Sequence, residues 1–205
     1  SCRIDYVKWD FNRPFTEAGS TMLDAAHQGE LNHRFTLGTY DLQHRLLTSY
    51  PDILLENCSG GGGRFDPAML YFSPQIWCSD NTDPIERLSI QFGTSLCYPS
   101  ESMGTHVSAS PRANIKTKGN VALWGTHGYE MDPGRFTPQD ELIVQEQVAA
   151  YHKYYDLVHT GDLYRLVSPN ENAYYCAWEL VAQDMHEALV TVVNMRQQPV
   201  SYTHL

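Results

Sequence analysis

Basic residues are scarce in this sequence: 14 Lys and Arg stand against 24 Asp and Glu, which gives a formal net charge of -10 at pH 7. Because nucleic acids and anionic membrane surfaces bind through clusters of Lys and Arg, neither is expected as a partner. The longest apolar runs are far shorter than the ~20 residues of a membrane-spanning helix. No basic-then-apolar signal opens the chain. A neutral substrate fits this composition better.

The cysteines lack a recognisable pattern. Five of them are spread over 205 residues with long irregular gaps and no Cys-x-x-Cys pair. An odd number in such an arrangement indicates neither a disulfide framework nor a zinc site, so we expect a reducing, cytoplasmic location. His106 and His127 lie near predicted strand ends, but their spacing matches no metal motif. Structural or pocket-lining histidines are therefore expected.

Two β-prone stretches end in an acid, as barrel strands do when they deliver a carboxylate to an active-site rim. Residues 4–10 predict a strand with Lys8 and Asp10 on one face and Trp9 on the other, and residues 75–80 predict a strand that ends in Asp80. A retaining glycosidase needs an ionised and a protonated carboxyl group about 5 to 5.5 Å apart. Since the charge of Lys8 favours the ionised form of Asp10, Asp10 suits the nucleophile and Asp80 the acid/base.

The alternative for these two acids is structural. Asp10 would then pair with Lys8 or Arg13, and Asp80 would help to cap a helix. A similar choice applies to the glycine run that follows Cys58. It could be a flexible linker, a phosphate cradle or a place where the backbone approaches a ligand. The Gly-Lys-Ser/Thr ending of a phosphate loop is absent, and an ordinary loop is the default.

Strands and helices alternate along the first 160 residues. Strands are predicted at 4–10, 53–58, 75–80, 103–109 and 121–125, with helices over 32–50, after Asp83 and after Thr137. This order predicts an α/β fold with a parallel sheet. Five strands cannot close an eight-stranded barrel, so we expect residues 1–160 to be the second part of a TIM (β/α)8 barrel. A barrel spends about 31 residues on each unit, which puts Asp10 and Asp80 roughly two units apart.

The pattern changes after Gly161. Alternating apolar residues around Trp178, and a β-rich run from Leu189 to Met195, predict an antiparallel hairpin. We expect residues 161–198 to begin a C-terminal β-sandwich domain. Residues 199–205 read like a translated sequencing-adaptor end and are expected to be a non-native tail.

Three motifs occur in order: KWDFNR at 8–13, ENCSGGGGRFD at 56–66 and WCSDNTD at 77–83. Together they resemble signatures of the α-galactosidases of glycoside hydrolase family thirty-six, and the similarity runs to about Met195. The resemblance implies a retaining enzyme that releases terminal α-linked galactose from oligosaccharides of the melibiose or raffinose type. It implies no metal or organic cofactor, and a homo-oligomer that is often a tetramer.

The resemblance also assigns roles to six residues. It implies that Asp10 is the nucleophile and Asp80 the acid/base. Galactose would be contacted by Lys8, Asn12, Cys58 and the main chain of Gly60.

The family's fold is an N-terminal β-sandwich, a central barrel and a small C-terminal β domain, so this chain would begin at the fourth barrel strand. An acidic pair, a Trp and an Arg that hold galactose in the family lie upstream of that point. We therefore expect these 205 residues to be inactive alone. A transglycosylase relative or a non-catalytic sugar-binding fragment is the alternative.

Overall fold

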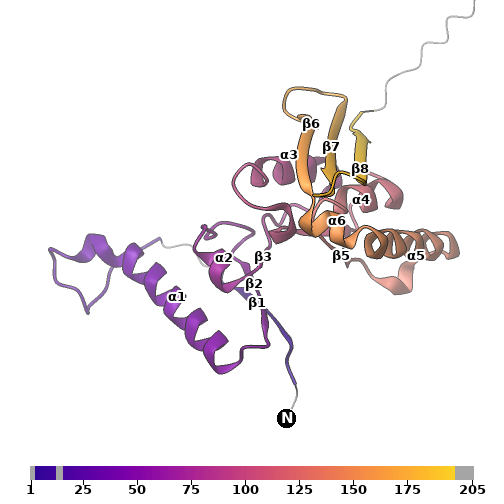
Figure 1. The fold of residues 1–205 in the computed structure, drawn as a ribbon. Helices are drawn as coiled ribbons and strands as arrows, with labels where there is room; N and C mark the ends of the chain where they lie inside the picture. The colour runs from indigo at the N-terminus through magenta and orange to yellow at the C-terminus, as the bar shows by residue number, and fades with distance from the viewer. Residues whose placement is uncertain (1–2, 13–15, 197–205) are drawn as a thin grey trace, which may run out of the picture. The chain divides into compact units, whose positions relative to one another are not determined.

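The structure is a computed structural model that describes residues 3–12 and 16–196. It forms two compact units, Ser1–Trp77 and Cys78–Leu205 (Figure 1). The tail predicted at 199–205 lies outside the described residues, as does Arg13. No helix in residues 3–12 and 16–196 is both long and apolar enough to cross a membrane.

The first unit holds a parallel three-stranded sheet in the order β1-β2-β3. Its elements are β1 (Tyr6–Asp10), η1 (Gln28–Glu30), α1 (Leu31–Ser49), β2 (Leu54–Cys58), α2 (Met69–Phe72) and β3 (Gln75–Ile76). The strands predicted at 4–10 and 53–58 and the helix predicted at 32–50 are confirmed. The third strand is much shorter than the predicted 75–80. The chain leaves the sheet after Ile76, so Asp80 lies in the segment that follows the strand.

The buried face of α1 differs from the prediction. The spacing of Leu42, Leu46 and Tyr50 predicts a buried apolar stripe, but Leu42 is 51% exposed and Tyr50 is 59% exposed. The residues that α1 buries are instead the polar Thr39 and Gln43. The Gln43 amide donates to Asn57 Oδ1 of β2 at 2.9 Å. A buried amide needs such a partner, and this pair sets the rotation of the helix against the sheet.

The second unit opens with a helix and a parallel strand pair. Its first elements are α3 (Pro84–Thr94), η2 (Ser100–Ser102), β4 (Gly104–Ser108), α4 (Ile115–Ala122), β5 (Thr126–Glu130), η3 (Pro133–Arg135), α5 (Pro138–Lys153) and α6 (Tyr155–Thr160). Both predicted helix caps are confirmed. The Asp83 carboxylate accepts from two backbone N–H groups of α3, and Thr137 forms a capping box with Asp140. Such caps contribute about 1 kcal/mol each.

The strand predicted at 121–125 is wrong. Val121 and Ala122 instead end α4, whose first turn is capped by the Asn114 side chain. Both residues are buried, and Thr105 of β4 donates its hydroxyl to Ala122 O at 2.6 Å. The apolar run is therefore explained by a helix face packed on β4, and the next strand begins only at Thr126.

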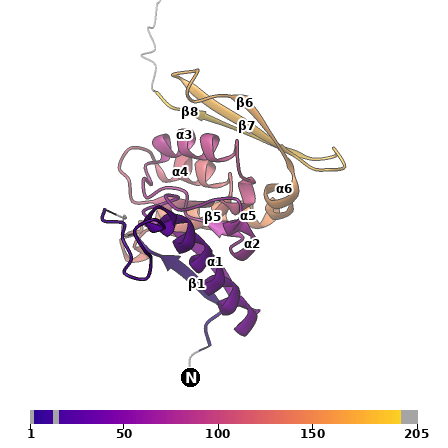
Figure 2. The ribbon, with the colours of Figure 1, turned by 90° about the vertical axis from the view of Figure 1, so that its left-hand side faces the viewer.

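An antiparallel sheet completes the second unit. It consists of β6 (Asp162–Val167), β7 (Tyr175–Val181) and β8 (Ala188–Asn194) in the order β6-β7-β8. The predicted hairpin is thus confirmed. Figure 2 shows this sheet over α3 and α4, where Trp178 stacks on Trp124 with ring centroids 4.2 Å apart. Such pairs contribute ~0.5–1.5 kcal/mol beyond their burial. The domain boundary at residue 161 stays a prediction.

Candidate active site

One face of the first sheet carries most of the predicted site. In the parallel register Lys8 lies opposite Glu56, and Asp10 lies opposite Cys58. Since residues two apart in a strand share a face, these pairs form successive layers that end at the carboxyl edge of β1 and β2. Five of the six predicted site residues meet in this unit: Lys8, Asp10, Asn12, Cys58 and Gly60.

Asn12 links the Asp10 carboxylate to the glycine run. Its Nδ2 donates to Asp10 Oδ2 at 3.1 Å, and its Oδ1 accepts from the backbone N–H of Gly60. The ladder also continues past the strands, because Phe11 N donates to Cys58 O at 3.2 Å. Asp10 is exposed and therefore open to a ligand. The Asn12 amide orients its carboxylate, and the backbone of Gly60 in turn orients the Asn12 amide.

The glycine run is a tight turn rather than a flexible linker. Gly60 and Gly61 have φ values of 57° and 82°, a region that side chains disfavour. Ser59 N donates to Gly61 O at 2.7 Å, and the Ser59 hydroxyl donates to Phe11 O at 2.9 Å. No atom lies within 4 Å of where a Cβ of Gly60 would be. The main chain of Gly60 therefore faces open space beside Asn12.

Cys58 is a buried thiol in the same layer as Asp10. Desolvation is the main cause and raises the pKa of the Cys58 thiol. A hydrogen bond with the Gly61 backbone lowers it, and the negative charge of Asp10 raises it by less than that bond lowers it. The thiol is only 3% exposed. It is thus a neutral, weakly polar surface next to the carboxylate, suited to contact with an uncharged ligand.

Lys8 lies one layer below Asp10 and is held on two sides. Its Nζ is 3.3 Å from Glu56 Oε1 and 4.7 Å from the centroid of the Trp77 ring. The Lys8 side chain is 35% exposed, whereas the Glu56 carboxylate is buried. Sequence reasoning placed Lys8 in the site but missed Glu56. Its position in the strand period, two residues before Cys58, could have indicated it.

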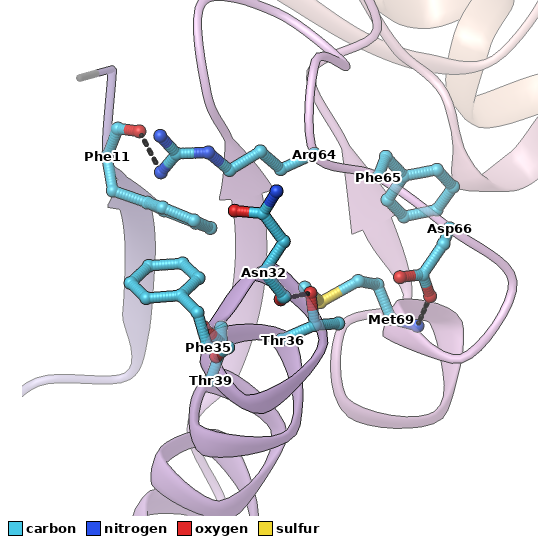
Figure 3. Close-up of a pocket in the computed structure, with 9 residues that line it drawn as sticks. All are labelled: Phe11, Asn32, Phe35, Thr36, Thr39, Arg64, Phe65, Asp66 and Met69. Atoms are coloured by element: carbon cyan, nitrogen blue, oxygen red, sulfur yellow. Dashed lines mark hydrogen bonds between the residues drawn. The ribbon is translucent and has the colours of Figure 1, made fainter. Parts of the chain in front are cut away.

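A pocket of about 340 Å³ opens between α1 and the segments that follow β1 and β2 (Figure 3). The Arg64 guanidinium donates to Phe11 O at 3.0 Å and lies over the rings of Phe11 and Phe35. The Phe11 ring therefore points to α1, on the other side of the backbone from the Asn12 contact with Asp10. This packing supports the end of β1. The pocket is lined by Phe11, Asn32, Phe35, Thr36, Thr39, Arg64, Phe65, Asp66 and Met69.

Asp80 belongs to the second unit and lies exposed on a hydrogen-bonded turn before α3. Asn81 N donates to Ser79 Oγ at 3.1 Å, and the buried Arg87 donates to Ser79 O at 3.2 Å. Asp83, rather than Asp80, caps α3. The turn holds Asp80 near a rigid helix start. The separation of its carboxyl group from Asp10 stays a prediction.

The two histidines have different surroundings. His106 Nδ1 lies 3.0 Å from Glu130 Oε1 across β4 and β5. The ring of His127 stacks on Tyr151 with centroids 5.3 Å apart. Within residues 3–12 and 16–196, no three His, Cys, Asp or Glu side chains are grouped to hold a metal ion.

Burial of His127 predicts a loss of stability in acid. Desolvation, with a contribution from His106, lowers the pKa of His127 from 6.5 to about 4. Protonation therefore favours the unfolded chain. The free energy of unfolding has its full contribution from neutral His127 above pH 6.5. It falls by up to about 3 kcal/mol as the pH falls toward 4.

We expect His127→Phe, which keeps a stacked ring, to make the free energy of unfolding less dependent on pH across this range. His152→Gln, at an exposed position of the same unit, should leave the slope unchanged, and an equal slope in the His127 variant would contradict the assignment.

Comparison with known proteins identifies the family. The family model described as Melibiase matches residues 1–161. This chain belongs to the melibiase family. Its relatives include α-galactosidase Mel36A of Lactobacillus acidophilus, which is 48% identical over 98% of this chain and 28% of its own length. α-Galactosidase AgaA of Geobacillus stearothermophilus is 47% identical over the whole chain and 29% of its own length. The chain thus spans somewhat more than a quarter of the length of these two melibiase relatives.

Solved melibiase relatives share the fold. GH36 α-galactosidase AgaA in complex with raffinose superposes with a TM-score of 0.89 at 48% identity, over 92% of this chain and 27% of that one. The α-galactosidase of Lactobacillus brevis superposes with a TM-score of 0.92 at 43% identity. The match covers 96% of this chain and 28% of that one. The α/β fold is therefore that of a segment of the GH36 α-galactosidases, which are TIM barrels with an added β domain. These relatives are glycoside hydrolases.

Proposed function

We propose that a full-length protein containing this chain is a retaining α-galactosidase that acts on oligosaccharides of the melibiose and raffinose type. The observation that carries the proposal is the layered site at the end of β1. Its exposed carboxylate is oriented by Asn12, lies one layer above the Lys8 ammonium and adjoins a neutral buried thiol. Family membership and the bound raffinose in a 48% identical relative support the same substrate class.

The proposed reaction has two displacements. In the first, Asp10 attacks the anomeric carbon, the bond to the leaving oxygen breaks, and Asp80 gives that oxygen its proton. In the second, Asp80 takes a proton from water, the water oxygen attacks the same carbon, and the bond to Asp10 breaks. Inversion occurs twice, so galactose leaves with its α configuration retained. Asp10 starts ionised, and the positive charge of Lys8 favours that state.

Binding of the sugar is assigned to the neighbours of Asp10. Lys8 and Asn12 donate hydrogen bonds to galactose hydroxyls, Cys58 lies against the ring, and Gly60 presents its main chain. The open space at Gly60 and the neutrality of Cys58 support these roles.

The spacing of the two aspartates gives independent support. The relative AgaA has been crystallised with raffinose and with stachyose as variants that each carry a different substituted aspartate, and those two positions are 70 residues apart. Asp10 and Asp80 have the same separation in this chain. Substitution of a reacting carboxylate is one way to keep a substrate intact in a crystal.

The remaining assignments concern the whole protein. We assign residues 1–160 to about strands four to eight of the barrel and residues 161–198 to the start of the C-terminal β domain. The protein is cytoplasmic and forms a homo-oligomer, of which a tetramer is one form.

The stereochemistry of release tests the proposal. A full-length protein carrying these residues should hydrolyse a nitrophenyl α-galactoside, and proton NMR should detect the α anomer of galactose before mutarotation produces the β anomer. A first product in the β form would overturn the double displacement. Transfer of galactose to an added acceptor sugar in place of water would indicate a transglycosylase. Binding of galactose without turnover would indicate a sugar-binding protein.

A further inference from the structure

Glu56 is a carboxylate in an unusual place. It lies in the middle of β2 and is 2% exposed, one layer below Cys58 on the face that carries the site. Removing a carboxylate from water is strongly unfavourable unless charged and hydrogen-bonding partners replace the water. Its neighbours therefore indicate why the sequence has an acid there.

Residues of both neighbouring strands meet at this carboxylate. From β1, the Tyr6 hydroxyl donates to Glu56 Oε2, and Lys8 Nζ lies 3.3 Å from Glu56 Oε1. From β3, Gln75 Nε2 donates to Glu56 Oε2 at 3.2 Å. The two strand pairings place Lys8 and Gln75 directly opposite Glu56. The carboxylate is thus anchored by three contacts from the sheet itself.

The contact with Lys8 limits a side chain that is otherwise free to move. A lysine has a flexible four-carbon stem and a compact ammonium with three donors. In this site the Lys8 ammonium lies over the Trp77 ring and forms an ion pair with Glu56. The Lys8 side chain remains 35% exposed, and the strand register places it one layer below Asp10 and Cys58.

We propose that Glu56 is a positioning residue that holds the Lys8 ammonium in the place where it binds the sugar. The inference rests on the proposed α-galactosidase function. Glu56 itself contacts no substrate, because it is buried below the layer that a ligand reaches. Its effect on the reaction passes through Lys8, and this sets it apart from an acid that only stabilises the sheet.

The test compares four variants of a full-length α-galactosidase that contains these residues: Glu56→Gln, Lys8→Met, their double variant and Tyr6→Phe. Glu56→Gln should lower kcat/KM for a nitrophenyl α-galactoside by about 10- to 100-fold, because the Lys8 ammonium loses its ion-pair partner. The loss in Glu56→Gln should fall on KM and kcat in the same proportion as the loss in Lys8→Met. In the Lys8→Met background, Glu56→Gln should change kcat/KM by less than about 3-fold, because coupled residues are not additive.

Tyr6→Phe is the matched control. It removes one hydrogen bond from the same carboxylate and leaves the ion pair, so kcat/KM should stay within about 3-fold of the wild type. Thermal melts of each variant separate stability from positioning. Lys8→Met leaves a buried charge without its cation, so adding Glu56→Gln to it should raise the melting temperature. Glu56→Asp, which keeps the charge but shortens the reach, replaces Glu56→Gln if that variant does not fold, and the same KM and kcat division is expected.

Two results would overturn the inference. Additive losses in the double variant, or a division between KM and kcat unlike that of Lys8→Met, would show that Glu56 does not act through Lys8. A wild-type protein without α-galactosidase activity would instead refute the proposed function, and the two failures are therefore distinguishable.

Discussion

Asp10→Asn in a full-length protein is expected to reduce turnover of α-galactosides by at least about 10⁴-fold, because an amide cannot form the covalent intermediate. Folding should be preserved, since the Asn12 side chain, which donates to this exposed carboxylate, can also bond to an amide. The measurement is kcat with a nitrophenyl α-galactoside, alongside a thermal melt. Asp5→Asn is the control, because Asp5 is an exposed acid just before the same strand. Equal activity in Asp10→Asn and Asp5→Asn would contradict the assignment of Asp10 as the nucleophile.

A second variant at this position identifies the chemical role. Asp10→Ala opens space for azide on the face that the carboxylate attacks. With α-galactosyl fluoride as substrate, azide should attack the anomeric carbon while fluoride leaves, and the product should be β-galactosyl azide. An α-galactosyl azide from this variant would be inconsistent with Asp10 as the nucleophile.

Asp80→Ala is expected to separate substrates by their leaving groups. The leaving oxygen of raffinose needs a proton. The activity of the variant on raffinose should therefore fall by roughly 10²–10⁴-fold, the usual contribution of a general acid. A dinitrophenyl galactoside needs no proton to leave, so its first step should be nearly unchanged and the intermediate on Asp10 should accumulate.

Azide then supplies the missing second step. It attacks the intermediate from the α face, restores turnover of the activated substrate and gives α-galactosyl azide, the opposite anomer from that expected with Asp10→Ala. Glu146→Gln, at an exposed position on α5 of the same unit, should retain full activity. Without rescue by azide, Asp80 could not be assigned as the acid/base.

Local signals were sufficient where the physical cause is local. Asp83 and Thr137 could be predicted as helix caps because a cap joins a side chain to N–H groups two or three residues away. The strands that carry Asp10 and Cys58 were also evident, since each contains a short run of apolar, β-prone residues. The three motifs likewise identified the family before the fold was known.

Long-range packing explains the predictions that were wrong. The run at 121–125 is β-prone, but the cap at Asn114 and the fit of Ala122 on β4 made it part of a helix. Leu42 belongs to an apolar stripe, but α1 turns its polar face to the sheet because Gln43 bonds to Asn57. In both cases a contact between residues distant in sequence outweighed the local pattern.

The sequence by itself determined which residues are proposed to carry the chemistry, because Asp10, Asp80 and their motifs can be identified from residue types in order. Only the tertiary structure decided how these residues support one another. The register of β1 on β2 places Lys8 opposite Glu56 and Asp10 opposite Cys58. A shift of one residue would turn those side chains to the other face, and no local feature of either strand specifies that alignment. For this reason the pairing of Lys8 with Glu56 was recognised only in the folded protein.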